Sequence, residues 1–149
     1  MLRDPDVARW NPAPDVIDLE SARAWCERGG DWSTGAHATF SVLDDERLVG
    51  NVSVFALDHA TAVASIGYRV APWARRRGVA TAAVATVTAW AFESLAVVRM
   101  QLFHAVANVA SCRVAGATGF ALEGVLRGAG LDGDGIRHDE HVHARLAGD

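Results

Sequence analysis

The chain of 149 residues lacks lysine altogether, so that its 14 basic residues are all arginines. Its two cysteines, Cys26 and Cys112, are too few and too far apart for a disulfide framework or a zinc site built on cysteine. No uncharged apolar run of about 18 residues occurs, and the first residues have no apolar centre of the kind that signal peptides contain. These absences predict a soluble, cytoplasmic protein with reduced thiols and no membrane partner.

The charge and the length set further bounds. A formal net charge of −4 argues against nucleic acid as the main partner, because proteins bind phosphate backbones through broad positive surfaces. Half of the residues are hydrophobic, which suffices for a core, and the length suits one domain of residues 1–149. An RNA-associated protein with a single basic loop is kept as a rival hypothesis.

The stretch from Val70 to Thr81 predicts a strand, a basic loop and a helix. Pro72 stops strand pairing, and a helical apolar period begins after Gly78. This helix is not preceded by a capping Ser, Thr, Asp or Asn. It is preceded by three arginines, Arg75–Arg77, although positive charge is unfavourable at a helix N-terminus. A bound anion would make the arrangement favourable, whereas a solvated turn is the alternative.

The rest of the chain reads as a mixed α/β protein. Apolar periodicity, turn residues and helix caps define the expected elements. Helices are expected over 4–10, 19–28, from 79 onward and over 108–117. Strands are expected over 38–42, 48–54, 62–70, 97–103, 122–127 and 137–146.

Several short motifs occur in a fixed order: Ile66-Gly67-Tyr68 with Pro72, Arg75-x-x-Gly78-x-Ala80, Asn108-x-x-Ser111 with Arg113, Gly119-Phe120 followed by Glu123-Gly124, and Arg137 with Asp139. Together they resemble the GNAT superfamily of N-acetyltransferases, in the branch similar to ribosomal-protein alanine N-acetyltransferases. The resemblance covers roughly residues 38–147. It implies an α/β (α+β) fold with a mostly antiparallel sheet that is splayed at the cofactor site and flanked by helices. The family's first strand is expected to be missing here, so that either the start is truncated or another chain supplies the edge; the second alternative favours a homodimer.

The resemblance also implies an activity and a site. The expected reaction transfers an acetyl group from acetyl-CoA to an amine of a small molecule or a protein amino terminus, by direct attack on the thioester. Ser111 and Tyr68 are the expected catalytic residues, with Ser111 assisting the departing thiolate. The expected cofactor-binding residues are Tyr68, Val70, Arg75, Arg76, Arg77, Gly78, Val79, Ala80, Thr81, Asn108, Ser111 and Arg113. A non-catalytic acyl-CoA-binding module is the alternative.

The sequence does not single out one residue as the general base. His59, His104 and Tyr68 are candidates by residue type, and a chain of water molecules to solvent is another. Many relatives in this branch carry a glutamate just before the Ile-Gly-Tyr motif, but this chain has Ser65 there. The sequence therefore offers no carboxylate at that position.

Three histidines near the C-terminus raise the question of a metal. On a strand, His141 and His143 share a face, whereas His138 points the other way. A solvated or substrate-facing strand is therefore preferred to a metal site as the interpretation of these histidines. The sequence thus predicts no metal site.

Overall fold

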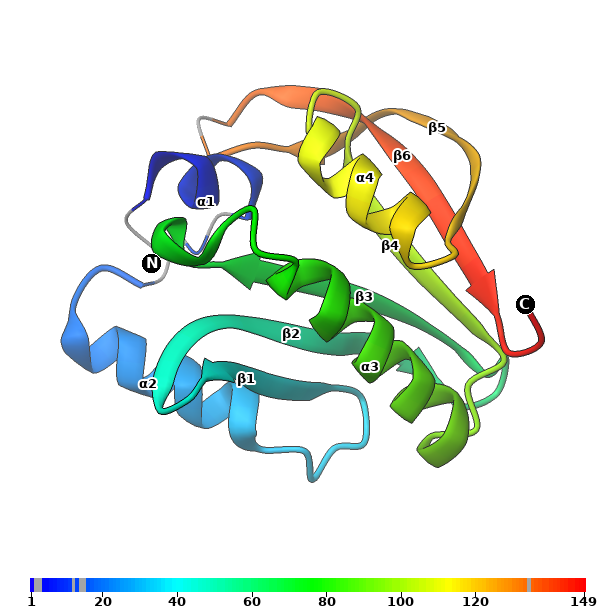
Figure 1. Ribbon diagram of the computed structural model, residues 1–149, viewed down its shortest axis with the longest axis horizontal. Coiled ribbons are helices and arrows are strands. Elements are labelled where there is room, and N and C mark those ends of the chain that lie inside the picture. The colour runs from blue at the N-terminus through cyan, green and yellow to red at the C-terminus, as the bar shows by residue number, and fades with distance from the viewer. Residues whose placement is uncertain (2–3, 12, 14–15, 134) are drawn as a thin grey trace.

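The computed structural model describes residues 1, 4–11, 13, 16–133 and 135–149. A six-stranded sheet with the order β1-β2-β3-β4-β6-β5 forms the centre, and helices flank it (Figure 1). The strands are β1 (Ala38–Asp44), β2 (Arg47–Asp58), β3 (Val63–Val70), β4 (Arg99–Ala105), β5 (Ala121–Leu131) and β6 (Arg137–Leu146). The helices are α1 (Pro5–Trp10), α2 (Leu19–Gly30), α3 (Val79–Ser94) and α4 (Val109–Ala117), with a 3-10 turn, η1 (Pro72–Ala74). The predicted fold class is confirmed.

The hydrophobic core lies between the sheet and helices α3 and α4. Alternate residues of the central strands point toward the helices, as the two-residue period of a strand requires. The buried members are Val52, Val54, Ala64, Ile66, Met100 and Leu102 from the strands, Val84, Val87 and Ala91 from α3, Ala115 from α4, and Val97 and Phe120. The large side chains Met100 and Leu102 are almost fully buried at the centre of this cluster.

The buried face of α3 differs from the one that the sequence suggested. The apolar spacing predicts a stripe through Val79, Ala83, Val87 and Trp90, whereas the buried residues of α3 are Val84, Val87, Thr88 and Ala91. The residues of α3 itself are apolar on nearly every side of the helix, so the helical period cannot single out one buried face. The position of the helix on the sheet decides the face.

Helix α2 begins where the sequence predicts. Asp18 caps it by accepting a hydrogen bond from the Ser21 backbone N–H at 2.8 Å, and the Ser21 hydroxyl bonds back to the Asp18 N–H at 3.0 Å. The spacing of Leu19, Ala22 and Cys26 predicts one apolar face, and this is wrong in part, because Leu19 is 79% exposed and Cys26 is exposed. None of the α2 residues is fully buried.

The last hairpin is longer than predicted, since β5 continues to Leu131. Gly128 interrupts the regular pairing with a left-handed φ of 59°. Its N–H donates to the Asp139 carboxylate at 2.8 Å, and its carbonyl accepts from Arg137 at 3.0 Å. Arg137 and Asp139 therefore fix an irregular strand that sequence periodicity cannot reveal.

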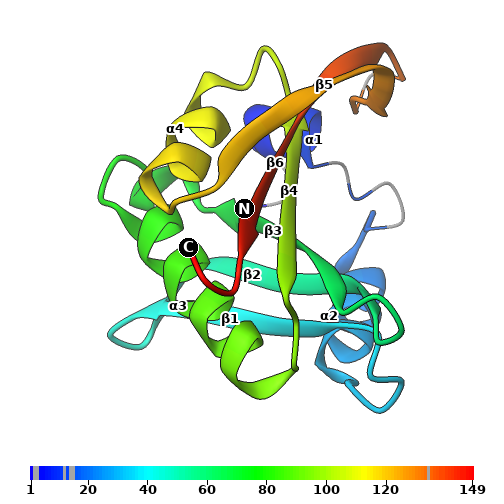
Figure 2. The same cartoon turned by 90° about the vertical axis from the view of Figure 1, so that its right-hand side faces the viewer.

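The sheet splits between β3 and β4. These two parallel strands pair only over Val63–Ser65 and Arg99–Gln101 and then separate (Figures 1 and 2). Beyond Ser65, the described part of β3 has a strand partner on the β2 side alone. The splay that the family resemblance implied is therefore present, and it leaves β3 backbone groups open toward the gap.

The sheet begins at β1, which pairs with β2 and forms one edge. None of the described residues before Ala38 lies in a strand; they form α1, α2 and connecting segments. Among the helices of the described chain, none combines the length and apolar character needed to cross a bilayer.

Candidate active site

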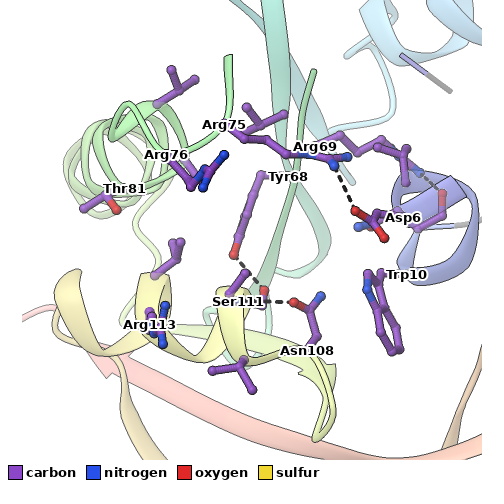
Figure 3. A pocket seen from close by; sticks show the side chains of 18 of the residues that line it. Asp6, Trp10, Tyr68, Arg69, Arg75, Arg76, Thr81, Asn108, Ser111 and Arg113 are labelled. Atoms are coloured by element: carbon purple, nitrogen blue, oxygen red, sulfur yellow. Dashed lines mark hydrogen bonds and ion pairs between the residues drawn. The ribbon is translucent and has the colours of Figure 1, made fainter. Parts of the chain in front are cut away.

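A cavity of about 570 Å³ opens where β3 and β4 separate (Figure 3). The end of β3, the loop before α3, and the first turns of α3 and α4 surround it, and α1 adds a further wall. Its lining includes every predicted cofactor residue except one: Tyr68, Val70, Arg75, Arg76, Gly78, Val79, Ala80, Thr81, Asn108, Ser111 and Arg113. Segments that are far apart in the sequence thus meet at one cavity.

Arg77 is the predicted cofactor residue that does not line the cavity. Its guanidinium pairs with the Asp44 carboxylate at 2.8 Å, at the turn between β1 and β2. The neighbouring Arg76 adopts a left-handed φ of 59°, so the loop turns sharply between consecutive arginines. A tripeptide of like residues therefore sends its side chains in different directions.

Helix α3 begins without a side-chain cap, as the sequence predicted. Gly78 occupies the N-cap position with φ 78°, and the first turn contains no acidic residue. The first N–H groups of a helix have no partner within it, and here Val79, Ala80 and Thr81 line the cavity. A Cβ on Gly78 would meet no atom within 4 Å, so glycine is favoured by the backbone angle rather than by lack of space. The local structure suits a bound anion.

Arg75 connects this loop to α1. Its guanidinium forms ion pairs with Asp4 and with Asp6, the latter at 2.9 Å. Asp4 also caps α1 by accepting from the Val7 N–H at 3.1 Å. The hydrogen bond from Arg75 is the main cause that lowers the pKa of Asp4 below its ordinary value. The positive charge of Arg75 is thus already shared with two carboxylates.

Tyr68 and Ser111 meet at the centre of the cavity. Their hydroxyl oxygens are 2.6 Å apart (Figure 3). Burial raises the pKa of the Tyr68 phenol, and the hydrogen bond with Ser111 only partly opposes this. Tyr68 is therefore protonated at neutral pH and can donate a proton or a hydrogen bond; as a base it is disfavoured.

Asn108 is the N-cap of α4. Its side-chain oxygen accepts from the Ser111 backbone N–H at 3.2 Å and caps α4. The cap fixes the first turn of the helix, on which the Ser111 hydroxyl faces Tyr68. Asn108 therefore lines the cavity and positions Ser111 at the same time.

The two histidine candidates for a general base lie elsewhere. His59 sits near the start of β3, at the other end from Tyr68, and its Nε2 donates to the Gly35 carbonyl at 3.2 Å. His104 belongs to β4, and its Nδ1 donates to the Ala105 carbonyl at 2.8 Å. Neither is among the described residues around the cavity, where Asp6 supplies the one carboxylate.

Sequence reasoning missed the contribution of α1 and of Arg69. Asp6, Val7, Trp10 and Asn11 line the cavity from α1 and its end. Arg69 is partly buried beside them, with one guanidinium nitrogen 3.5 Å from the Asn11 carbonyl oxygen. Burial lowers the pKa of Arg69 from its ordinary value. The acidic pair Asp4 and Asp6 was the signal that could have indicated this contact, because its negative charge is complementary to the positive charge of the arginine loop.

Comparison with known proteins places these features in context. A family model described as an acetyltransferase (GNAT) domain matches residues 1–121. The putative ribosomal N-acetyltransferase YdaF of Bacillus subtilis (strain 168) is 37% identical over 98 residues, which are 66% of this chain and 53% of that protein. The chain thus spans about half the length of this curated relative.

Solved structures agree with the fold. Mycobacterium smegmatis RimJ, in complex with CoA-disulfide, superposes with a TM-score of 0.87 at 26% identity, over 96% of this chain and 71% of that one. A ribosomal-protein-S5-alanine acetyltransferase from Vibrio fischeri gives a TM-score of 0.86 at 19% identity, over 97% of this chain and 82% of that one.

Proposed function

The chain belongs to the GNAT acetyltransferase family, and we propose that it transfers an acetyl group from acetyl-CoA to an amine, acting as a single domain of residues 1–149. One observation carries the proposal. The uncapped start of α3 with two arginines before it, and a hydroxyl pair formed by Tyr68 of β3 and Ser111 of α4, line the same cavity. These are the features that a ligand with a pyrophosphate at one end and a thioester at the other requires.

The proposed cofactor position follows from the electrostatics of the cavity. The pyrophosphate binds at the start of α3, where the first-turn N–H groups of Val79, Ala80 and Thr81 and the side chains of Arg75 and Arg76 supply donors and positive charge. The pantetheine arm, which contains two amides, then runs along the open side of β3. Its amides pair there with backbone groups that have no strand partner toward β4.

The proposed chemistry is direct transfer. The amine nitrogen attacks the thioester carbonyl, a tetrahedral intermediate forms, and its collapse breaks the carbon–sulfur bond and releases CoA. The Tyr68 and Ser111 hydroxyls lie side by side in the cavity, where they donate to the developing thiolate. A thiol has a pKa of about 8.5, far below that of a serine hydroxyl, so Ser111 hydrogen-bonds the sulfur and Tyr68 is the better proton donor.

The proton on the attacking amine leaves through water in this proposal. Asp6 is the carboxylate that lines the described cavity, and it is engaged by Arg75. Ser65 replaces the glutamate that many relatives carry, and it is buried within β3. A solvent route therefore fits the site better than a dedicated side-chain base.

The acceptor is proposed as a primary or secondary amine of a small molecule or of a protein amino terminus. The name of YdaF, a putative ribosomal N-acetyltransferase, favours a ribosomal protein as the source of the amine. Asp6, Trp10 and Asn11 form the cavity wall near the gap, and we place the acceptor beside them.

The decisive experiment follows CoA release and product mass with acetyl-CoA and a panel of amines. The panel contains peptides with N-terminal alanine, a polyamine and small amino compounds, and acetyl-CoA alone serves as the blank. Acetyl-CoA should raise the melting temperature, and at least one amine should gain an acetyl group. Stabilisation by acetyl-CoA without any acetylated amine would favour the acyl-CoA-binding module. No stabilisation would contradict both.

Homodimerisation and a cytoplasmic location belong to the proposal as well. The outer edge of β1 has no strand partner among the described residues, and an apolar hollow formed by Phe40, Val42, Ala83 and Trp90 lies beside it. Pairing of such an edge with a second copy would cover it. Light scattering that gives the monomer mass at working concentration would remove the dimer, and cell fractionation tests the location.

A further inference from the structure

Four side chains with metal-binding atoms meet outside the acetyl-transfer cavity. They come from three elements: His104 from β4, Cys112 from α4, and His141 and His143 from β6. One nitrogen or sulfur atom of each lies within 4.8 Å of those of the others. None of the four lines the cavity that contains Tyr68 and Ser111. We call this group the His/Cys cluster.

The sheet register brings the three histidines together. His104 lies directly opposite His141 in the antiparallel β4–β6 pair, so the two side chains share a face. His143 follows two residues later on the same strand and therefore points to that face too. Helix α4 covers this part of the sheet (Figure 1), and Cys112 lies one turn before the buried Ala115. His138, on the opposite face, is not a member.

Hydrogen bonds determine which ring nitrogens carry protons. Nδ1 of His104 contacts the Ala105 carbonyl at 2.8 Å, and Nδ1 of His143 contacts the Phe120 carbonyl at 3.3 Å. A carbonyl oxygen only accepts, so both Nδ1 atoms are donors. In the neutral rings both Nε2 atoms then carry lone pairs, yet these atoms lie 3.1 Å apart.

Two facing lone pairs repel unless something lies between them. Both rings are buried, since His104 is 5% exposed and His143 is 3% exposed. Nδ1 of His141 is also buried without a hydrogen-bond partner among the described residues. The His/Cys cluster therefore contains two Nε2 atoms that face each other and one buried ring nitrogen without a hydrogen-bond partner in the described chain, which a bound cation would satisfy.

We propose that the His/Cys cluster binds one Zn²⁺ ion with tetrahedral coordination. Two imidazole nitrogens on tetrahedral Zn²⁺ are about 3.3–3.4 Å apart, given Zn–N bonds of about 2.0–2.1 Å. The observed Nε2–Nε2 separation of 3.1 Å is close to that value. The thiolate of Cys112 and a nitrogen of His141 complete four ligands after small side-chain rotations, since all four atoms already lie within 4.8 Å.

The surroundings match those of metal-bound histidines. Such rings donate their second N–H to a carboxylate, a backbone carbonyl or water, and the Ala105 and Phe120 carbonyls already hold His104 and His143 in this way. Three imidazoles and one thiolate suit Zn²⁺ better than Mg²⁺ or Ca²⁺, which prefer oxygen ligands. Four protein ligands close the coordination sphere, so the ion is structural.

The ion would fasten α4 to the β4–β6 pair. Cys112 directly follows Ser111, whose hydroxyl contacts Tyr68 on the far side of the splay. A bond from Cys112 to an ion held by the sheet limits how far the first turn of α4 can move. Zn²⁺ therefore positions Ser111 without touching the substrate.

The test measures binding of Zn²⁺ alone and of Co²⁺ alone to the reduced, full-length chain. We expect one equivalent of either ion, a rise in melting temperature, and a Co²⁺ spectrum with intense tetrahedral bands and a thiolate charge-transfer band. Cys112→Ser should remove the charge-transfer band, and Cys112→Ser and His141→Ala should each lower the Zn²⁺ affinity by roughly 10²-fold or more. Without metal, Cys112→Ser should melt close to the parent, which shows that it folds.

Two matched variants complete the design. His138→Ala removes a histidine from the same strand, and Cys26→Ser removes the other cysteine, which is exposed; both should bind like the parent. The proposal is overturned if the parent binds neither ion, or if Cys112→Ser keeps the parent affinity or the charge-transfer band. Equal loss of binding in the two matched variants would overturn it as well, because the ion would then not be held by the His/Cys cluster.

Discussion

The hydroxyl oxygen of Tyr68 lies 2.6 Å from that of Ser111, across the gap where the sheet divides. This contact joins the end of β3 to the first turn of α4, which lie on opposite sides of the gap. Because Asn108 caps α4 through the Ser111 N–H, the position of the serine is fixed from both sides. The hydroxyl pair is the chemical centre of the cavity, and the first two predictions concern it.

Ser111→Ala should lower kcat at saturating acetyl-CoA by roughly 10-fold, and at most 10²–10³-fold, while the Kd of acetyl-CoA stays nearly constant. A hydrogen bond to sulfur strengthens only as thiolate charge develops, so its loss raises the barrier without weakening the ground state. Steady-state kinetics and calorimetric titration measure the two quantities. Ser94→Ala, at the exposed end of α3, is the matched control. Parent-like turnover in Ser111→Ala, with chemistry rate-limiting, would remove Ser111 from the mechanism.

Tyr68 is the one tyrosine of the chain, so tyrosinate absorbance reports it alone. Its midpoint in the folded protein should lie above 10.0, because burial raises the pKa of the phenol. In Ser111→Ala the midpoint should rise further, since the hydrogen bond that opposes the shift is gone. The folded state prefers the neutral phenol, so this contribution to stability is complete below pH 10 and decreases as the pH rises through the folded pKa. A folded midpoint at or below 10.0 would contradict the assignment.

Asp6→Asn should raise the affinity for CoA, by about 2–5-fold at low ionic strength, and the gain should fall as salt is added. The Asp6 carboxylate lines the cavity and competes with the pyrophosphate for Arg75. Its neutralisation therefore removes both its repulsion of the pyrophosphate and its competition for the Arg75 guanidinium. Asp44→Asn, which frees Arg77 outside the cavity, is the control and should leave the affinity unchanged. Weaker CoA binding in Asp6→Asn would show that α1 holds Arg75 in the binding position instead.

Gly78→Asp should abolish measurable CoA binding, whereas Gly78→Asn should retain most of it. Both substitutions place a side chain at φ 78°, which costs roughly 1 kcal/mol in stability, and neither Cβ meets another atom within 4 Å. The two variants should therefore melt at similar temperatures and differ only in the added charge beside the pyrophosphate. Calorimetric titration and thermal melts check this, and equal CoA affinity in both variants would place the pyrophosphate elsewhere.

Much of the fold could be predicted because its signals are local. The caps at Asp18 and Asn108, the uncapped start of α3 at Gly78 and the two-residue alternation in the strands are properties of a few neighbouring residues. Motif order then indicated that the arginine loop and the start of α4 share a ligand. Eleven of the twelve predicted cofactor residues line one cavity, and Arg77 is the exception.

The sequence by itself determined the elements, the uncapped helix with its arginines, and the shared face of His141 and His143. Only the tertiary structure decided what meets across elements. Asp6 reaches Arg75 because α1 docks against the loop, and His104 faces His141 because β4 and β6 pair in one register. Register and docking are set by the packing of the whole core, and a shift of one residue would turn these side chains to the other face. Patterns of neighbouring residues therefore do not predict strand register or helix docking.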